Sequence, residues 1–483
     1  MDFIRVSPVN YQYMKVTIVT CYKDPDYVRA RTLRAGLAAN AGVEMTIVKN
    51  KHKNILRYPE TIIRLVIDRI NNRPDAYILT FRGYEILPFL QLIAWSKPII
   101  FDEFINPLEW LAEPRHEKWV GLIPKKALKK FYVALLGRCR FILADTQAHA
   151  DYSVKLSGQQ TNVLDSPKTP RSQGESARAK TVLSEGEVAL ATSREEKPFV
   201  ADRIRSGDEG VFDRSSKYWA IPVGTDETVF DYKLDLRKIA RSQGKSVRVG
   251  SGFTEGEVAI STLKEGRPLP AEISWSGDGG VLRKSSKVRV LEKYFQVFYY
   301  GNMLPLHGLE YVLEAAVLLK NNQNIKFLIV GGNSRTVKMI KNAQQQGAKI
   351  KYQNWIPFEE LPKVIATSSL CLGGPFGKTN QAQKVITGKT YQFLASGAAT
   401  LIGNTEASAL FIDKKNSLVV PLADPLALAT TIDWAYQHRQ QLPAIGQAGN
   451  RLYQENFSVR IITGELSAIL TKLASGMSNN RHH

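Results

Sequence analysis

Two residues that can carry positive charge, His307 and Lys389, stand beside glycines in the second half of the 483-residue chain. An aromatic, strand-like run ends on Gly301, and an apolar run ends on the glycine pair 331–332. Glycines at the carboxyl ends of strands are where open α/β sheets bind phosphate-bearing ligands. A cationic side chain at such a place can offset the negative charge that develops on a departing phosphate. The spacing therefore predicts a phosphate site.

The elements that must position these residues alternate regularly between strand and helix. In the first half, continuous β-branched runs predict strands buried on both faces, separated by helices with apolar residues three and four apart. The predicted strands are 15–20, 44–48, 76–80, 98–101 and 141–144, and the predicted helices are 29–40, 61–71 and 86–94. The second half gives a helix over 309–319 and a strand over 326–330. This rhythm predicts doubly wound parallel sheets.

The segment Tyr391 to Ile402 reads as a buried helix, a stop at Gly397 and another strand. With the glycine turns before it, this order of elements resembles the donor-binding half of GT-B glycosyltransferases, closest to the retaining family 4 type, the glycosyl transferases group 1. The resemblance implies an α/β fold of two Rossmann-like domains with a cleft between them. It also implies transfer of a sugar from a nucleoside diphosphate sugar to a saccharide or lipid-linked acceptor with retention, in cell-surface polysaccharide synthesis.

The residues at the expected donor site depart from the family pattern. Asn302 and His307 stand where the family has an arginine and a lysine, and Gln392 stands at its second glutamate. Lys389, one turn before Gln392, is the candidate replacement cation, so His307 and Lys389 are the predicted catalytic pair. Their alternatives are a packing histidine and a solvated lysine. The resemblance assigns donor binding to Gly301, Asn302, Gly308, Gly374, Phe376, Gly377 and Gln392.

Three residues in the first half follow predicted strands and are candidates for contacting the acceptor. Asp102 and Glu103 end the strand that begins at about 98, and Arg82 follows the strand 76–80. Because parallel strands end at one edge of a sheet, these side chains are expected at the cleft.

No Asp-x-Asp stands where a metal-dependent transferase would need it, so we expect a metal-independent reaction with no cofactor beyond the donor substrate. The lost family residues leave a second hypothesis open, a catalytically impaired GT-B protein acting as a binding or scaffold subunit. Nucleic-acid binding is a third reading of the basic charge, and no readout motif accompanies it.

A direct repeat interrupts the middle of the chain. The sequence Arg-Ser-Gln-Gly at 171–174 recurs at 241–244, an offset of 241 − 171 = 70 residues that holds for several further matches. Two copies are too few for a solenoid, and their Gly, Ser and charge content disfavours a core. The expected organisation is an acceptor domain 1–160, repeat copies 161–217 and 233–292 around an interdomain segment 218–232, a nucleotide-sugar domain 293–446, and a crossover helix and tail 447–483.

The formal net charge of +20 calls for an anionic partner or surface. Lysines 125, 126, 129 and 130 flank apolar residues at helical spacing, which is typical both of a membrane-surface helix and of an ordinary amphipathic helix. The first residues lack the apolar core of a secretory signal, so we expect a cytoplasmic protein, peripheral on the inner face of the plasma membrane if the lysine helix binds lipid.

Overall fold

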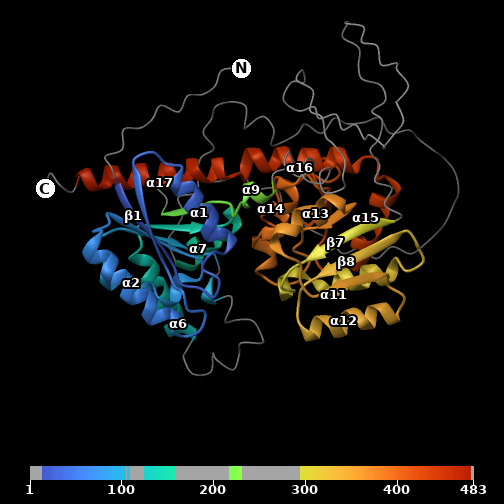
Figure 1. Cartoon of the computed structure of the whole chain (residues 1–483), viewed down its shortest axis with the longest axis horizontal. Coiled ribbons are helices and arrows are strands. Elements are labelled where there is room, and N and C mark those ends of the chain that lie inside the picture. The colour runs from blue at the N-terminus through green and yellow to red at the C-terminus, as the bar shows by residue number, and fades with distance from the viewer. Residues whose placement is uncertain (1–13, 105, 109–124, 158–216, 231–293, 480–483) are drawn as a thin grey trace, which may run out of the picture.

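The computed structural model describes residues 14–104, 106–108, 125–157, 217–230 and 294–479. Two six-stranded parallel sheets lie side by side, each between layers of helices, and the last two helices run along one side of both (Figure 1). The predicted pair of doubly wound domains is confirmed. The two repeat copies lie outside the described residues, apart from Lys217, so the structure does not test them.

The amino-terminal sheet has the strand order β2-β1-β3-β4-β5-β6. Its strands are β1 Met14–Thr20, β2 Val43–Lys49, β3 Ala76–Thr80, β4 Ile99–Asp102, β5 Phe141–Ala144 and β6 Tyr218–Ala220. The helices are α1 Val28–Ala38, α2 Arg57–Asn71, α3 Leu87–Ala94, α6 Lys125–Gly137 and α7 Gln147–Ser157, with a 3-10 turn η1 at Gly83–Glu85. Residues of α2, α3, α6 and α7 share one hydrophobic core on one face of the sheet.

The carboxyl-terminal sheet has the order β12-β11-β10-β7-β8-β9. Its strands are β7 Phe295–Tyr300, β8 Ile325–Val330, β9 Ile350–Gln353, β10 Leu370–Leu372, β11 Thr400–Gly403 and β12 Leu418–Val420. The helices around it include α11 Leu309–Leu318, α12 Ser334–Gln345, α13 Leu361–Thr367, α14 Gly388–Ala395 and α15 Pro425–Gln437, with 3-10 turns η3 Pro305–His307, η4 Phe358–Glu360 and η5 Ala382–Lys384. Among the predicted strands, 76–80 and 141–144 match at both ends, because their runs are largely apolar and buried at every position.

The prediction of a single long closing helix from 447 is wrong. The chain forms α16 Leu442–Asn456 and α17 Val459–Asn479. Between them Phe457 is buried against Tyr391 and Phe411. The Glu227 carboxylate, from the short helix α9 Glu227–Phe230, accepts a 2.7 Å hydrogen bond from the backbone N–H of Val459. That acceptor satisfies a donor at the new helix start, which stabilises the break.

The last helix returns to the first domain. Ile462, Leu466 and Ile469 of α17 are fully buried against α1 and the sheet strands β1 and β3. No helix in the described part of the chain has the length and apolar character needed to cross a bilayer.

Candidate functional site

Two glycine-containing loops interlock at the carboxyl end of β7. Gly301 follows this strand with φ of 144°, a conformation that favours glycine. A Cβ on Gly308 would lie 2.5 Å from the backbone nitrogen of Gly377, and one on Gly377 would lie 2.1 Å from the Pro305 carbonyl oxygen. Only residues without side chains permit this backbone contact. The two loops therefore form one fixed surface beneath the expected donor.

His307 ends η3 and turns its ring towards Gly301. A Cβ on Gly301 would lie 3.5 Å from ring atoms Cε1 and Nδ1. Nδ1 is buried and has no hydrogen-bond partner. Burial, and secondarily the charge of Lys389, hold the imidazole pKa well below its ordinary value. The His307 ring is therefore neutral at neutral pH, and it can still donate a hydrogen bond.

Lys389 is the second residue of α14, and its side chain is 6% exposed. Its ammonium lies 4.4 Å from the centre of the Tyr299 ring and makes no hydrogen bond. A Cβ on Gly301 would lie 3.9 Å from Nζ, so the amine and the His307 ring flank the same point of backbone. Burial lowers the lysine pKa to about 7. The solvated-lysine alternative is therefore wrong.

Gln392 lies one turn further along α14 and is also buried. Its side-chain oxygen Oε1 has no hydrogen-bond partner. Buried polar atoms without partners are uncommon, because each loses its hydration without compensation. Three such atoms lie here, one on His307 in the turn that follows β7 and two on Lys389 and Gln392 of α14. The arrangement fits a polar, anionic ligand that supplies the missing partners.

The other predicted donor residues divide into backbone and side-chain positions. Gly301, Gly308, Gly374 and Gly377 belong to the interlocked loops, and the side chain of Asn302 is exposed. Phe376 is 2% exposed and packs in the core, with its ring centre 6.4 Å from that of Tyr299. Contact between the Phe376 side chain and the donor is therefore not supported, and the ring instead holds the ligand-facing loop against the sheet.

Two of the three acceptor candidates have structural partners instead. Asp102 is fully buried and accepts hydrogen bonds from the Arg29 guanidinium at 2.8 to 3.3 Å. Arg29 also donates to the carbonyl oxygen of Ile221 at 2.6 Å, so it ties β4 to the interdomain segment. Buried Glu103 accepts hydrogen bonds from Tyr132 and Asn106. Their surroundings contradict a role in binding acceptor hydroxyls.

Arg82 is the acceptor candidate that the structure leaves partly exposed, at 23% of its side chain. It follows β3 in the left-handed region, with φ of 54°, and Phe81 before it also has positive φ, at 25°. Non-glycine residues adopt this conformation at a cost and are concentrated at functional sites. The guanidinium is held by a 3.0 Å hydrogen bond to the Tyr84 hydroxyl.

Sequence reasoning missed Asp145, which follows β5 as Asp102 ends β4. It is buried, and its Oδ1 lies 2.8 Å from Nδ1 of His149, four residues on. The neighbouring Thr146 hydroxyl donates to the carbonyl oxygen of Lys384 in the other domain. The rule that selected Asp102, a polar residue just after a buried strand, would also have selected Asp145. No cluster of three or more His, Cys, Asp or Glu suited to a metal occurs among the residues that the structure describes.

Solved structures with the same architecture are known. The chain is similar to Anabaena HepE crystallised with UDP-glucose, with a TM-score of 0.57 and 11% identity over 95% of this chain and 100% of that one. The chain is also similar to sucrose-phosphate synthase from Thermosynechococcus elongatus, with a TM-score of 0.59 and 11% identity over 96% of this chain and 100% of that one. A third similar structure is a glycosyltransferase from Rickettsia africae, with a TM-score of 0.54 and 11% identity over 96% of this chain and 99% of that one. No curated protein matches the sequence.

Two parallel sheets, a returning terminal helix and these likenesses define a GT-B protein. Residues 294–438 match the family model described as Glycosyl transferases group 1. This match lies in the carboxyl-terminal domain.

Proposed function

We propose that this protein is a glycosyltransferase that takes its sugar from a nucleoside diphosphate sugar bound at the carboxyl-terminal domain. The observation that carries the proposal is a set of three buried, unpartnered polar atoms, His307 Nδ1, Lys389 Nζ and Gln392 Oε1, of which the first two flank Gly301. A diphosphate supplies acceptors for the lysine and a neutral histidine N–H, and a ribose hydroxyl supplies a donor for the glutamine oxygen. The donor named with HepE makes UDP-glucose the first candidate to test.

The reaction we infer proceeds with retention of configuration. The acceptor hydroxyl oxygen bonds to the anomeric carbon on the face from which the phosphate departs. The bond between that carbon and the phosphate oxygen breaks, and the hydroxyl proton passes to a phosphate oxygen. Lys389, protonated in the complex, and a hydrogen bond from His307 offset the charge on the leaving diphosphate. Because a cation is already positioned there, we propose that no metal ion or other cofactor is needed.

The acceptor we propose is a saccharide or lipid-linked saccharide used in cell-surface polysaccharide synthesis, reached from the cytoplasmic side. Of the predicted acceptor residues, Arg82 is the one whose side chain remains partly exposed after β3. Its fixed, cationic head suits recognition of hydroxyl or phosphate oxygens.

Calorimetric titration of the full chain with a panel of nucleotide sugars, UDP-glucose first, tests donor binding. Transfer is then followed with saccharide and polyprenyl-phosphate-linked saccharide acceptors, with and without a chelator, and the anomeric configuration of the product is read by NMR. An inverted product would contradict retention, and loss of activity with the chelator would contradict metal independence.

Binding of a nucleotide sugar without transfer to any acceptor would favour the scaffold alternative. Absence of binding, persisting in the double variant Gln392→Glu with His307→Lys, would overturn the transferase proposal itself.

A further inference from the structure

The outer side of α2 is apolar where a surface helix is normally polar. Ile63, Val66, Ile67 and Ile70 are between 41% and 65% exposed. Their spacing of three and four residues places them on one side of the helix, away from buried Leu65, which faces the sheet. The stripe is thus turned to solvent over the length of the helix.

The neighbouring helix α3 repeats this arrangement with larger side chains. Phe89 is 47% exposed and Leu92 is 68% exposed, on the side away from buried Leu90. Trp95, which ends the helix, is 82% exposed. Both helices pack on the same face of the sheet, so their two exposed stripes form one apolar surface.

The third helix of this layer, α6, supplies positive charge. Lys126, Lys129 and Lys130 are exposed, and Phe131 beside them is 56% exposed. The rest of its apolar side, including Tyr132, packs into the domain core and is not available to a membrane. The lysine helix can therefore contribute charge and one aromatic ring, whereas the apolar area comes from α2 and α3.

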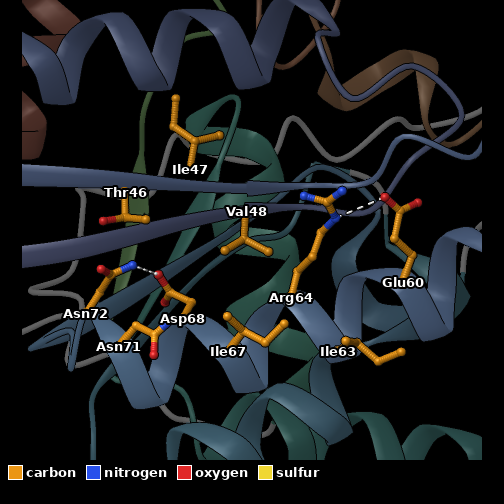
Figure 2. A pocket seen from close by; sticks show the side chains of 10 residues that line it. All are labelled: Thr46, Ile47, Val48, Glu60, Ile63, Arg64, Ile67, Asp68, Asn71 and Asn72. Carbon is orange, nitrogen blue, oxygen red and sulfur yellow. Dashed lines mark hydrogen bonds and ion pairs between the residues drawn. The ribbon is translucent and has the colours of Figure 1, made fainter.

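The carboxylates of this layer are already engaged. Glu60 accepts from Arg64 at 2.9 Å, Asp68 from Asn72 at 2.7 Å, and Glu85 of η1 lies 3.7 Å from Arg57. Figure 2 shows the first two pairs in the groove between β2 and α2. Basic side chains around the apolar surface have no ion-pair partner among the described residues, namely Lys51, Lys53, Arg73, Lys126, Lys129 and Lys130. The surface therefore presents unneutralised positive charge around exposed apolar and aromatic groups.

We propose that the outer face of α2, α3 and α6 binds an anionic lipid bilayer. Exposed aliphatic and aromatic side chains enter the boundary between headgroups and acyl chains, and lysines contact the anionic headgroups. A helix from a partner protein would cover one groove, whereas the apolar residues here extend over adjacent helices with tryptophan at the margin. The exposed Ile55 and Leu56 extend this surface at the amino-terminal end of α2, which lies towards the carboxyl ends of the strands.

The inference rests on the proposed function in one respect, that the bilayer would present the lipid-linked acceptor. Its test measures vesicle binding and requires no sugar transfer. The full chain is sedimented with vesicles of phosphatidylcholine alone or mixed with phosphatidylglycerol. We expect binding to the mixed vesicles to fall about tenfold or more in the variant Ile67→Gln, Ile70→Gln, Leu92→Gln, since each substitution removes apolar contact. The variant Lys126→Gln, Lys129→Gln, Lys130→Gln is expected to lose the preference for anionic vesicles, and added salt should do the same.

The matched control is Ile412→Gln with Leu426→Gln, exposed apolar residues of the other domain, which should leave vesicle binding unchanged. Comparison of the wild type with Trp95→Phe should assign to Trp95 a blue shift of fluorescence on vesicle addition. All these positions are exposed, so the variants should keep the wild-type melting temperature and donor affinity. Equal sedimentation of wild type and the α2–α3 variant overturns the proposal. So does a wild type that ignores vesicles but self-associates through these residues, since the face would then be a protein interface.

Discussion

The two domains of this protein share one architecture. They differ in which buried polar atoms they leave without a hydrogen-bond partner. At the carboxyl ends of the second sheet, buried polar atoms of His307, Lys389 and Gln392 lack partners. At the corresponding ends of the first sheet, the carboxylates of Asp102 and Glu103 are fully engaged, and Asp145 Oδ2 is the exception among the strand-end carboxylates that the structure describes. The exposed large apolar side chains show the opposite distribution and are concentrated on the outer helices of the first domain.

This contrast teaches that position at the end of a strand does not by itself make a ligand site. A polar side chain there is available to a ligand only when the surrounding fold leaves it without a partner, as in the second domain. In the first domain Asp102 and Glu103, at such positions, fasten the chain together.

The largest effect is expected for Asp102→Ala, which leaves the buried Arg29 guanidinium without its counter-charge. Breaking a buried ion pair by removing one partner costs about 3–5 kcal/mol in unfolding free energy. Denaturant unfolding measures this loss. The control is Glu44→Ala, whose partner Lys15 and own carboxylate are each nearly half exposed, and which should lose no more than about 1 kcal/mol. A small effect at Asp102 would return it to the acceptor candidates.

Lys389→Met should lower turnover by about a hundredfold, because it removes the cation beside the leaving diphosphate. Stability should hold or rise, since a buried, unpartnered amine is replaced by an apolar side chain of similar length. Initial rates and thermal melting measure the two effects. Lys378→Met, at an exposed position in the facing loop, is the matched control. Equal effects at both lysines would remove Lys389 from the site.

Donor affinity should depend on pH through Lys389. Burial holds its pKa at about 7, and a bound diphosphate favours the charged form, so binding above pH 7 requires uptake of a proton. The association constant should be nearly constant below pH 7 and fall by about tenfold per pH unit well above it. Titrations in buffers of different ionisation enthalpy measure the proton uptake. A pH-independent affinity, equal to that of Lys389→Met, would contradict this linkage.

The smallest effect is expected for Gln392→Glu. Both side chains offer an acceptor oxygen at the same distance from the backbone, so donor affinity should change by no more than about threefold if that oxygen meets a ribose hydroxyl. Gln392→Leu keeps the volume and removes the acceptor, and it should weaken binding by about tenfold, as expected for a lost hydrogen bond. Calorimetry compares the three proteins, and equal affinity of the leucine variant would show that the oxygen faces no ligand.

Local sequence patterns predicted much of the fold because strands buried on both faces are continuous apolar runs. They placed β3 and β5 at both ends. They also predicted that His307 and Lys389 belong to one site, because the glycine turns and the resemblance to a family indicate the order of elements there. The positions of these strands and turns could be inferred because they depend on residues that are neighbours in the sequence.

Whether a polar side chain is free to bind a ligand could not be inferred from the sequence, because this depends on partners that are distant along the chain. Asp102 is bound by Arg29, which lies 73 residues earlier. The apolar spacing of α2 predicts a helix with one apolar side, but only the packed structure shows that Ile63 and Ile67 face away from the core. The break between α16 and α17 likewise depends on Glu227, which lies 232 residues before Val459.

The returning helix α17 also sets the order in which the chain can fold during synthesis. Met14, Ile18 and Leu37 of the first domain share a core with Leu466 and Leu470, which are synthesised after the second domain. The first sheet thus emerges early but keeps one apolar face uncovered until the second domain has been made. We expect a nascent chain stopped before residue 459 to bind chaperones that recognise exposed apolar surface, and the full-length protein to release them.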